Sequence, residues 1–379
     1  GNFTNALTAE GRDPGKHGVY VETLDDGEPV AMMNEDTLFN PASVIKLATT
    51  LAALNRLGPN HRFHTDLLAD GEINEKAGEL NGDLVLFSGR DPSFSISDAK
   101  RAGESLRKFG VRRVNGSLVV IGDFNCNYNA QTDVSAGVFE RNSGVTFRDP
   151  IKYEDYNSQP RGRLLVTVES DTLLRIAQYQ NAHSVNSMAD MLVGHIGGPQ
   201  YVKNFLVEQA GLSPDAIKIS TGSGLKVNRM TPRDTVKMLR AMVNWLDKYG
   251  LKADAVMGLG GIDPGTMRAR FSACPVNVER SRSIDCSSPM STSRVSKSGK
   301  VLPASAKTKS PACAIAAASP SVLSATVLPP AFGPVIAKPR RSGARSTSIG
   351  TTGRPESASS GCRAARGVTP SPNAGRVHP

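Results

Sequence analysis

Apolar residues recur with two different periods in the first part of the chain. Val19, Val21 and Thr23 alternate with their neighbours, Asp26-Gly27 forms a turn and Val30 to Met33 return, which predicts a β-hairpin with a tight turn. Beyond the hairpin, apolar residues recur every three or four positions until Gly58, at Val44, Leu47, Leu51 and Leu54. This spacing predicts an amphipathic helix that starts near residue 41.

The middle of the chain changes from mixed elements to helices. The pattern predicts strands at 84–87 and 118–121 and a helix at 97–109. From residue 171 onward it is mainly helical, with predicted helices at about 171–180, 187–195, 199–209 and 231–245. A body of this length has room for two domains.

The last part of the chain lacks both periods. Residues 272–379 contain 15 lysines and arginines but three acidic residues, and Phe332 is their one aromatic residue. Such a segment cannot bury a core, so we expect a disordered, basic, low-complexity tail. Our hypothesis is that it was translated from a wrong reading frame after about residue 271. The alternative is a genuine disordered tail, and sequencing the gene across the junction in independent isolates distinguishes the two.

The tail also explains the bulk charge. The chain has a formal net charge of +10, yet residues 1–271 hold 30 basic and 32 acidic residues. A nucleic-acid partner is therefore not expected for the body. Cys126 is the one cysteine before residue 272, which excludes a disulfide framework there. No apolar run is long enough for a transmembrane segment. No signal peptide is visible in the sequence, which begins at Gly1 without an initiator methionine, so we expect a mature or truncated product.

Candidate chemistry begins at Ser43 and Lys46. Three residues apart on a helix, they share a face, so the amine can take the proton of the hydroxyl. Ser43 would also lie in the first turn, behind Asn40 as cap and Pro41, where free N–H groups favour negative charge. Taken alone, the pair is more typical of a polar first-turn serine and a surface lysine than of a catalytic pair.

A second polar pair follows between two predicted helices. Ser184 and Asn186 lie on the short connection between the helices at 171–180 and 187–195. A hydroxyl there can relay a proton to a leaving amine, and an amide can hold a substrate carbonyl. The alternative is a capping serine with a turn asparagine.

The order Ser-x-x-Lys, then Ser-x-Asn, is the motif set of penicillin-recognising acyl-serine enzymes. The surrounding segments resemble the serine-type D-alanyl-D-alanine carboxypeptidase/endopeptidases, the class C low-molecular-mass penicillin-binding proteins. The resemblance covers about residues 17–271. It includes the segments 39–47, 88–94, 184–192, 221–232 and 260–271.

The resemblance implies an α+β fold: a penicillin-binding/β-lactamase-like transpeptidase domain, an antiparallel sheet flanked by helices, with an inserted α/β domain. It divides the chain into an N-terminal part of the acyl-serine transferase domain (1–63), an inserted domain (64–160), the helical remainder (161–271) and the tail (272–379). The family's last strands follow its third motif, so we expect these strands to be missing and the hairpin edge to be uncovered.

The resemblance also implies a function. Ser43 would be the nucleophile, Lys46 its base, Ser184 the proton relay and Asn186 a peptide-binding residue, with no cofactor and no metal. The substrates would be peptidoglycan stem peptides, β-lactams would be covalent inhibitors, and the location would be extracytoplasmic, periplasmic or associated with the cell wall.

The family's third motif, Lys-Thr/Ser-Gly, does not follow Phe271. Lys297-Ser298-Gly299 matches its letters, but Pro303 makes the next residues a poor strand. Loss of this motif would inactivate the enzyme. Two alternatives stay open: a β-lactamase or esterase of the same fold, and a non-catalytic protein with an anion-binding tail.

Overall fold

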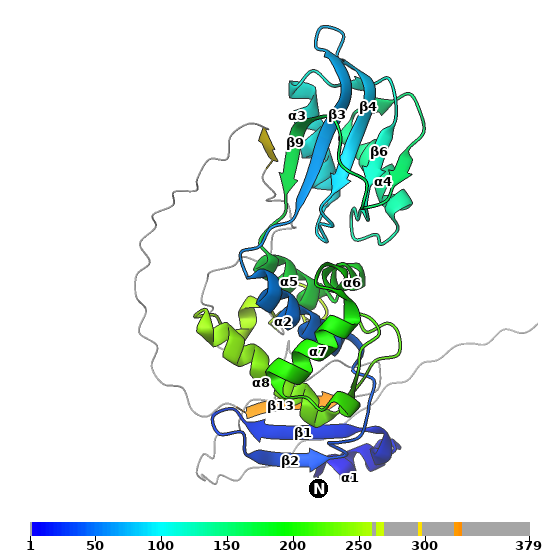
Figure 1. The fold of residues 1–379 in the computed structure, drawn as a ribbon. Helices are drawn as coiled ribbons and strands as arrows, with labels where there is room; N and C mark the ends of the chain where they lie inside the picture. Colours follow the sequence, from blue (N-terminus) through cyan, green and yellow to red (C-terminus); the bar gives the residue numbers. More distant parts are fainter. Residues whose placement is uncertain (1, 260–262, 269–294, 298–321, 328–379) are drawn as a thin grey trace, which may run out of the picture. The chain divides into compact units, whose positions relative to one another are not determined.

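The computed structural model describes residues 2–259, 263–268, 295–297 and 322–327, the last two segments as backbone only (Figure 1). The predicted hairpin is present as β1 (Gly18–Thr23) and β2 (Pro29–Met33), which pair antiparallel. β13 (Val322–Val327) pairs with the other edge of β1, which gives the strand order β13-β1-β2.

The prediction that this edge of the hairpin stays uncovered is wrong. All six residues of β1 are in register with β13, from Gly18 opposite Val327 to Thr23 opposite Val322. The strand comes from the segment expected to be disordered, where Val-Leu-Ser-Ala-Thr-Val is a short run rich in β-branched residues. An open strand edge offers unpaired N–H and C=O groups to such a run. The remainder of the predicted disordered tail, apart from β12 and β13, lies outside the described residues.

Five longer helices follow the predicted pattern closely, with boundaries within a few residues of those expected. They are α2 (Ile45–Leu57), α5 (Leu173–His183), α6 (Asn186–His195), α7 (Gly198–Ala210) and α8 (Pro232–Lys248). Their apolar faces share one hydrophobic core, in which Ile45, Leu51 and Leu54 of α2 are almost completely buried. α2 therefore lies in the centre of the helical part, and its first turn is held on several sides.

A capped helix ties this core to the hairpin. Thr231 accepts a hydrogen bond from the Asp234 N–H at 3.0 Å, with a proline at the first position, so α8 begins where the sequence predicts. Arg240 of α8 donates to the Glu22 carboxylate at 2.7 Å and to the carbonyls of Thr23 and Leu24. These bonds hold α8 against the end of β1.

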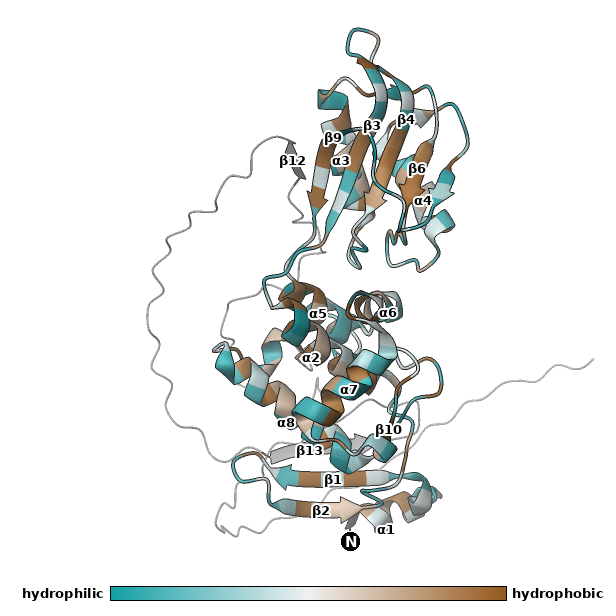
Figure 2. Cartoon of the chain, viewed as in Figure 1, coloured by the Kyte–Doolittle hydropathy of each residue, from teal (hydrophilic) through white to brown (hydrophobic). Residues whose placement is uncertain are grey.

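A second sheet is built around β3 (His64–Asn74), which pairs antiparallel with β4 (Glu79–Ser88) and β9 (Arg163–Glu169). The other strands of this sheet are β5 (Arg113–Val114), β6 (Leu118–Ile121), β7 (Thr146–Phe147), β8 (Lys152–Glu154) and β12 (Val295–Lys297). Hydrophobic residues are concentrated on β3, β4, β6 and β9 (Figure 2).

The helices α3 (Ile96–Lys108) and α4 (Thr132–Ser143) belong to the core of this second sheet. α3 starts with a capping box, in which Ser95 and Asp98 exchange side-chain to backbone hydrogen bonds. The strand and helix predictions at 84–87, 97–109 and 118–121 are thus confirmed by β4, α3 and β6.

The remaining described elements are short: α1 (Asn2–Ala9), β10 (Ile217–Lys218), β11 (Arg229–Met230) and the 3₁₀ turns η1 (Pro14–Lys16), η2 (Ala42–Val44), η3 (Pro214–Ala216) and η4 (Ala253–Ala255). The predicted domain boundaries stay predictions.

Candidate active site

The four residues singled out in the sequence meet at one place. Ser43 lies in η2, Lys46 in the first turn of α2, Ser184 at the end of α5, and Asn186 at the start of α6. The Lys46 amine donates to Ser43 Oγ at 3.0 Å and to Asn186 Oδ1 at 2.7 Å. Ser184 Oγ donates to Ser43 Oγ at 2.9 Å. Ser43 itself is exposed, so a substrate can reach its hydroxyl.

The turn that carries Ser43 has an unusual backbone. Ala42 adopts φ +46°, a left-handed conformation that residues with a Cβ rarely take. Asn40 Oδ1 accepts the Ala42 N–H at 3.0 Å. Asn40, which the sequence marked as a helix cap, thus holds this turn with its side chain. The helix therefore starts with a 3₁₀ turn in place of the regular α-turn expected from Pro41, and such strain is often found at functional sites.

The connection between α5 and α6 is equally constrained. Ser184 caps α5 in the left-handed region with φ +56°, and its N–H donates to the Gln180 carbonyl. The carbonyl of Ala182 accepts the N–H of Thr266 at 2.9 Å. A Cβ on Gly265 would lie 2.2 Å from that same carbonyl, so the segment 263–268 packs tightly against the end of α5. This packing fixes the direction of Ser184.

Lys46 is almost completely buried, with 1% of its surface exposed. It makes a third hydrogen bond, to the Ser223 carbonyl at 2.7 Å, so its three protons have three acceptors. Burial lowers the pKa of Lys46 from 10.5 to about 8, and the negative charge of Asp190 opposes that shift. Loss of one proton leaves a lone pair directed at the Ser43 hydroxyl.

The segment 222–224 contributes a part of the site that the sequence did not single out. Besides the Ser223 carbonyl, the Gly222 carbonyl accepts the hydroxyl proton of Thr49 on α2 at 3.0 Å. A Cβ on Gly224 would lie 2.1 Å from the Ala42 carbonyl. The resemblance had marked this segment, yet a backbone carbonyl as ligand of a lysine leaves no signal in a sequence.

Thr221, directly before this segment, stabilises the turn with its side chain. Its Oγ1 accepts the Gly224 N–H at 3.2 Å and the Asn228 amide at 3.4 Å.

The candidate third motif has a different place. Lys297 is the last residue of β12, where it is paired with Val166 of β9 in the second sheet and not with a strand of the β13-β1-β2 sheet. Ser298 and Gly299 lie outside the described residues.

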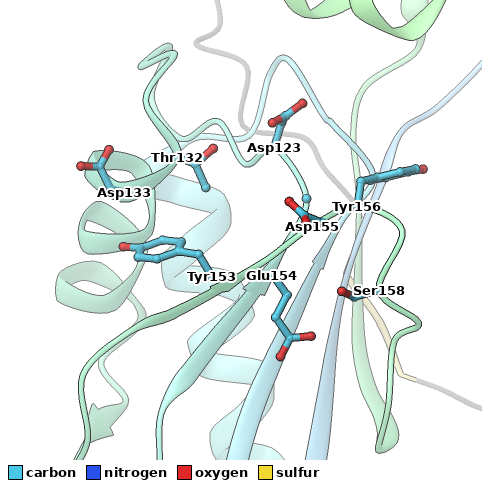
Figure 3. A pocket seen from close by; sticks show the side chains of 9 residues that line it. Asp123, Thr132, Asp133, Tyr153, Glu154, Asp155, Tyr156 and Ser158 are labelled. Carbon is cyan, nitrogen blue, oxygen red and sulfur yellow. The ribbon is translucent and has the colours of Figure 1, made fainter.

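A separate hollow of about 610 Å³ lies among residues 122–158 (Figure 3). Its lining is acidic and aromatic, with Gly122, Asp123, Thr132, Asp133, Tyr153, Glu154, Asp155, Tyr156 and Ser158. The four candidate site residues do not contribute to it. Within the described part of the chain, no group of three or more His, Cys, Asp and Glu residues could hold a metal ion. No described helix is long and apolar enough to cross a membrane.

Part of the chain is similar to known D-Ala-D-Ala carboxypeptidases. Residues 4–124 match the model of the D-Ala-D-Ala carboxypeptidase 3 (S13) family. The D-alanyl-D-alanine carboxypeptidase DacB of Haemophilus influenzae is 29% identical over 103 residues, which cover 27% of this chain and 21% of that protein. The D-alanyl-D-alanine carboxypeptidase of Actinomadura sp. is 35% identical over 101 residues, 27% of this chain and 18% of its own length. The matched stretch thus spans about a fifth of each relative.

Solved structures extend the similarity beyond this stretch. Penicillin-binding protein 4 of Haemophilus influenzae superposes with a TM-score of 0.57 at 19% identity, over 68% of this chain and 82% of that one. A penicillin G-acylated predatory endopeptidase of Bdellovibrio bacteriovorus gives 0.55 at 19% identity, over 66% and 74%. Residues 4–124 are thus similar to the D-Ala-D-Ala carboxypeptidase 3 (S13) family, and the described residues have the α+β fold of penicillin-binding protein 4.

Proposed function

We propose that the protein is a serine-type D-Ala-D-Ala carboxypeptidase/endopeptidase that works through an acyl-enzyme. One observation carries the proposal: the exposed Ser43 hydroxyl is within hydrogen-bond distance of both the Lys46 amine and the Ser184 hydroxyl. A nucleophile flanked by a base and a proton relay is the arrangement that acyl transfer requires.

The first step is acylation. Neutral Lys46 takes the proton of Ser43, and Oγ attacks the carbonyl carbon between two D-alanines. The C–N bond then breaks, and the leaving amine receives a proton through Ser184. Since the pKa of Lys46 is about 8, roughly a tenth of the molecules hold the neutral amine at pH 7.

The remaining groups orient the substrate. Asn186 is held by its Oδ1 on Lys46, and we assign its amide group to the peptide carbonyl. The Ser43 N–H would supply one oxyanion donor, and a donor of this kind contributes on the order of a hundred- to a thousandfold in rate. The second donor of the family belongs beyond the third motif, outside the described residues. Water then releases the acyl group, with Lys46 again as base.

The substrate class follows from this chemistry and from the relatives' names. Peptidoglycan stem peptides end in D-Ala-D-Ala, so they are the proposed substrates, and the proposed location is outside the cytoplasm. β-Lactams would acylate Ser43. A β-lactamase, an esterase and a non-catalytic protein with an anion-binding tail are less well supported, because the matching family and relatives are carboxypeptidases.

The test uses a fluorescent penicillin on the full chain, with Ser43→Ala as control. We expect covalent labelling of the wild type that disappears in the variant, and release of D-alanine from a D-Ala-D-Ala peptide. Rapid loss of the label by hydrolysis would indicate the β-lactamase instead. A folded wild type that takes up no label would refute the proposal.

A further inference from the structure

Asp190 lies one helical turn after Asn186 on α6. Its Oδ1 accepts the N–H of Ser223 at 3.0 Å. The Ser223 carbonyl accepts a hydrogen bond from the Lys46 amine at 2.7 Å. A carboxylate and an amine therefore hold the two backbone polar groups of one buried residue.

The rest of this segment contacts both helices. The Gly222 carbonyl accepts the Thr49 hydroxyl of α2 at 3.0 Å, and a Cβ on Gly222 would lie 2.6 Å from the Ala189 carbonyl of α6. Gly224 packs against the Ala42 carbonyl of η2. Asp190 supplies the hydrogen bond that links the segment to α6, the helix that also carries Asn186. By holding Ser223, Asp190 can set the position of the carbonyl that accepts a hydrogen bond from Lys46.

Asp190 also acts on Lys46 by charge. The groups in hydrogen-bond contact with the amine are the Ser43 hydroxyl, the Asn186 amide and the Ser223 carbonyl, and none of them is charged. Asp190 is the charged group that influences the amine, and it favours the ammonium form against the effect of burial.

The geometry points to Asp190 as a positioning residue for acylation: its carboxylate holds Ser223, whose carbonyl accepts a hydrogen bond from the Lys46 amine. This inference rests on the proposed function. It implies that Asp190 holds the base in one place while a smaller fraction of Lys46 is neutral at pH 7 than without it.

Three substitutions separate the two roles. Asp190→Asn keeps an acceptor for the Ser223 N–H but removes the charge, Asp190→Ala removes both, and Asp190→Glu keeps the charge. Glu208→Gln is the matched control, because it removes one negative charge from an exposed position on α7. The rate of acylation by fluorescent penicillin is measured from pH 6 to pH 10 for each protein.

We expect the midpoint of the acylation profile to move to lower pH in Asp190→Asn and Asp190→Ala, by about 0.2 to 0.7 of a pH unit, as for a partly solvated charge pair. Removing a negative charge disfavours the ammonium form, so acylation at pH 7 rises about twofold in Asp190→Asn. The plateau at high pH falls roughly tenfold in Asp190→Ala and is unchanged in Asp190→Asn, which keeps the acceptor for the Ser223 N–H. Asp190→Glu restores the midpoint, and Glu208→Gln leaves it unchanged.

A second readout does not need an active enzyme. The Lys46 side chain is titrated by NMR in protein with ¹³C-labelled lysine, with the signal assigned by its loss in Lys46→Arg. If Lys46 titrates at the same pH in wild type and Asp190→Asn, the inference is wrong, whether or not the wild type is labelled. If the titration shifts but the wild type takes up no penicillin, the charge role stands and the proposed function fails.

Discussion

Gly224→Ala tests how tightly the backbone under the nucleophile is packed. Gly224 has φ +90°, and an added Cβ would lie 2.1 Å from the Ala42 carbonyl oxygen and 3.2 Å from Ile45 Cγ2. The first of these atoms belongs to the peptide bond that leads into Ser43. Relief of the clash therefore has to move either the segment 222–224 or the nucleophile turn.

The size of the effect follows from the distances. The contact must open by about 1.3 Å, from 2.1 Å to an ordinary 3.4 Å. A misplacement of about 1 Å can cost on the order of a hundredfold in rate, so we expect acylation of Ser43 to fall by about that factor. Overpacking adds about 1–3 kcal/mol of destabilisation to the cost of the positive φ, which is itself about 1–2 kcal/mol.

Gly211→Ala is the matched control. Gly211 also has a positive φ, +65°, at the end of α7, but a Cβ there meets no atom within 4 Å. Both variants bear the backbone cost, and only Gly224→Ala bears the clash. The assay combines denaturant unfolding with the rate of penicillin acylation. If Gly224→Ala, while folded, acylates within about twofold of Gly211→Ala, the packing argument is refuted.

Three further outcomes are expected. The stability of the wild type relative to Lys46→Met rises between pH 8 and pH 10.5, because the buried lysine has its pKa lowered to about 8 and the unfolded chain binds more protons in that window; a flat difference in unfolding free energy would contradict this. Ser184→Ala removes the hydroxyl that donates to Ser43 at 2.9 Å, so release of D-alanine falls by about a hundredfold or more, whereas the unfolding free energy changes by less than about 1.5 kcal/mol. Leu106→Ala empties a fully buried position in the core of the second sheet and lowers the unfolding free energy by about 2–5 kcal/mol; acylation of the folded fraction at Ser43 then serves as the control.

Much of the local structure of this protein can be predicted from its sequence. The strand pattern from Gly18 to Met33 and the helical spacing after Val44 reflect periods that the backbone itself imposes, and β1, β2 and α2 follow them. The proximity of Ser43 and Lys46 is of the same kind, because three residues on a helix bring two side chains together whatever the rest of the chain does.

The tertiary structure decided the remainder. Ser184 reaches Ser43 across 141 residues of sequence, and the Ser223 carbonyl reaches Lys46 across 177. The sequence could suggest the first contact only through a resemblance, and it could not suggest the second, since every residue has a carbonyl. The sequence did not predict the pairing of β13 with β1, because these six residues lie in a stretch without periodicity. They form a strand only where an open strand edge supplies partners for their backbone groups. Packing over long separations also buries Lys46, and this burial, not the Ser-x-x-Lys spacing, lowers the pKa of the amine. The same packing brings Asp190 near the amine, where its charge opposes the shift.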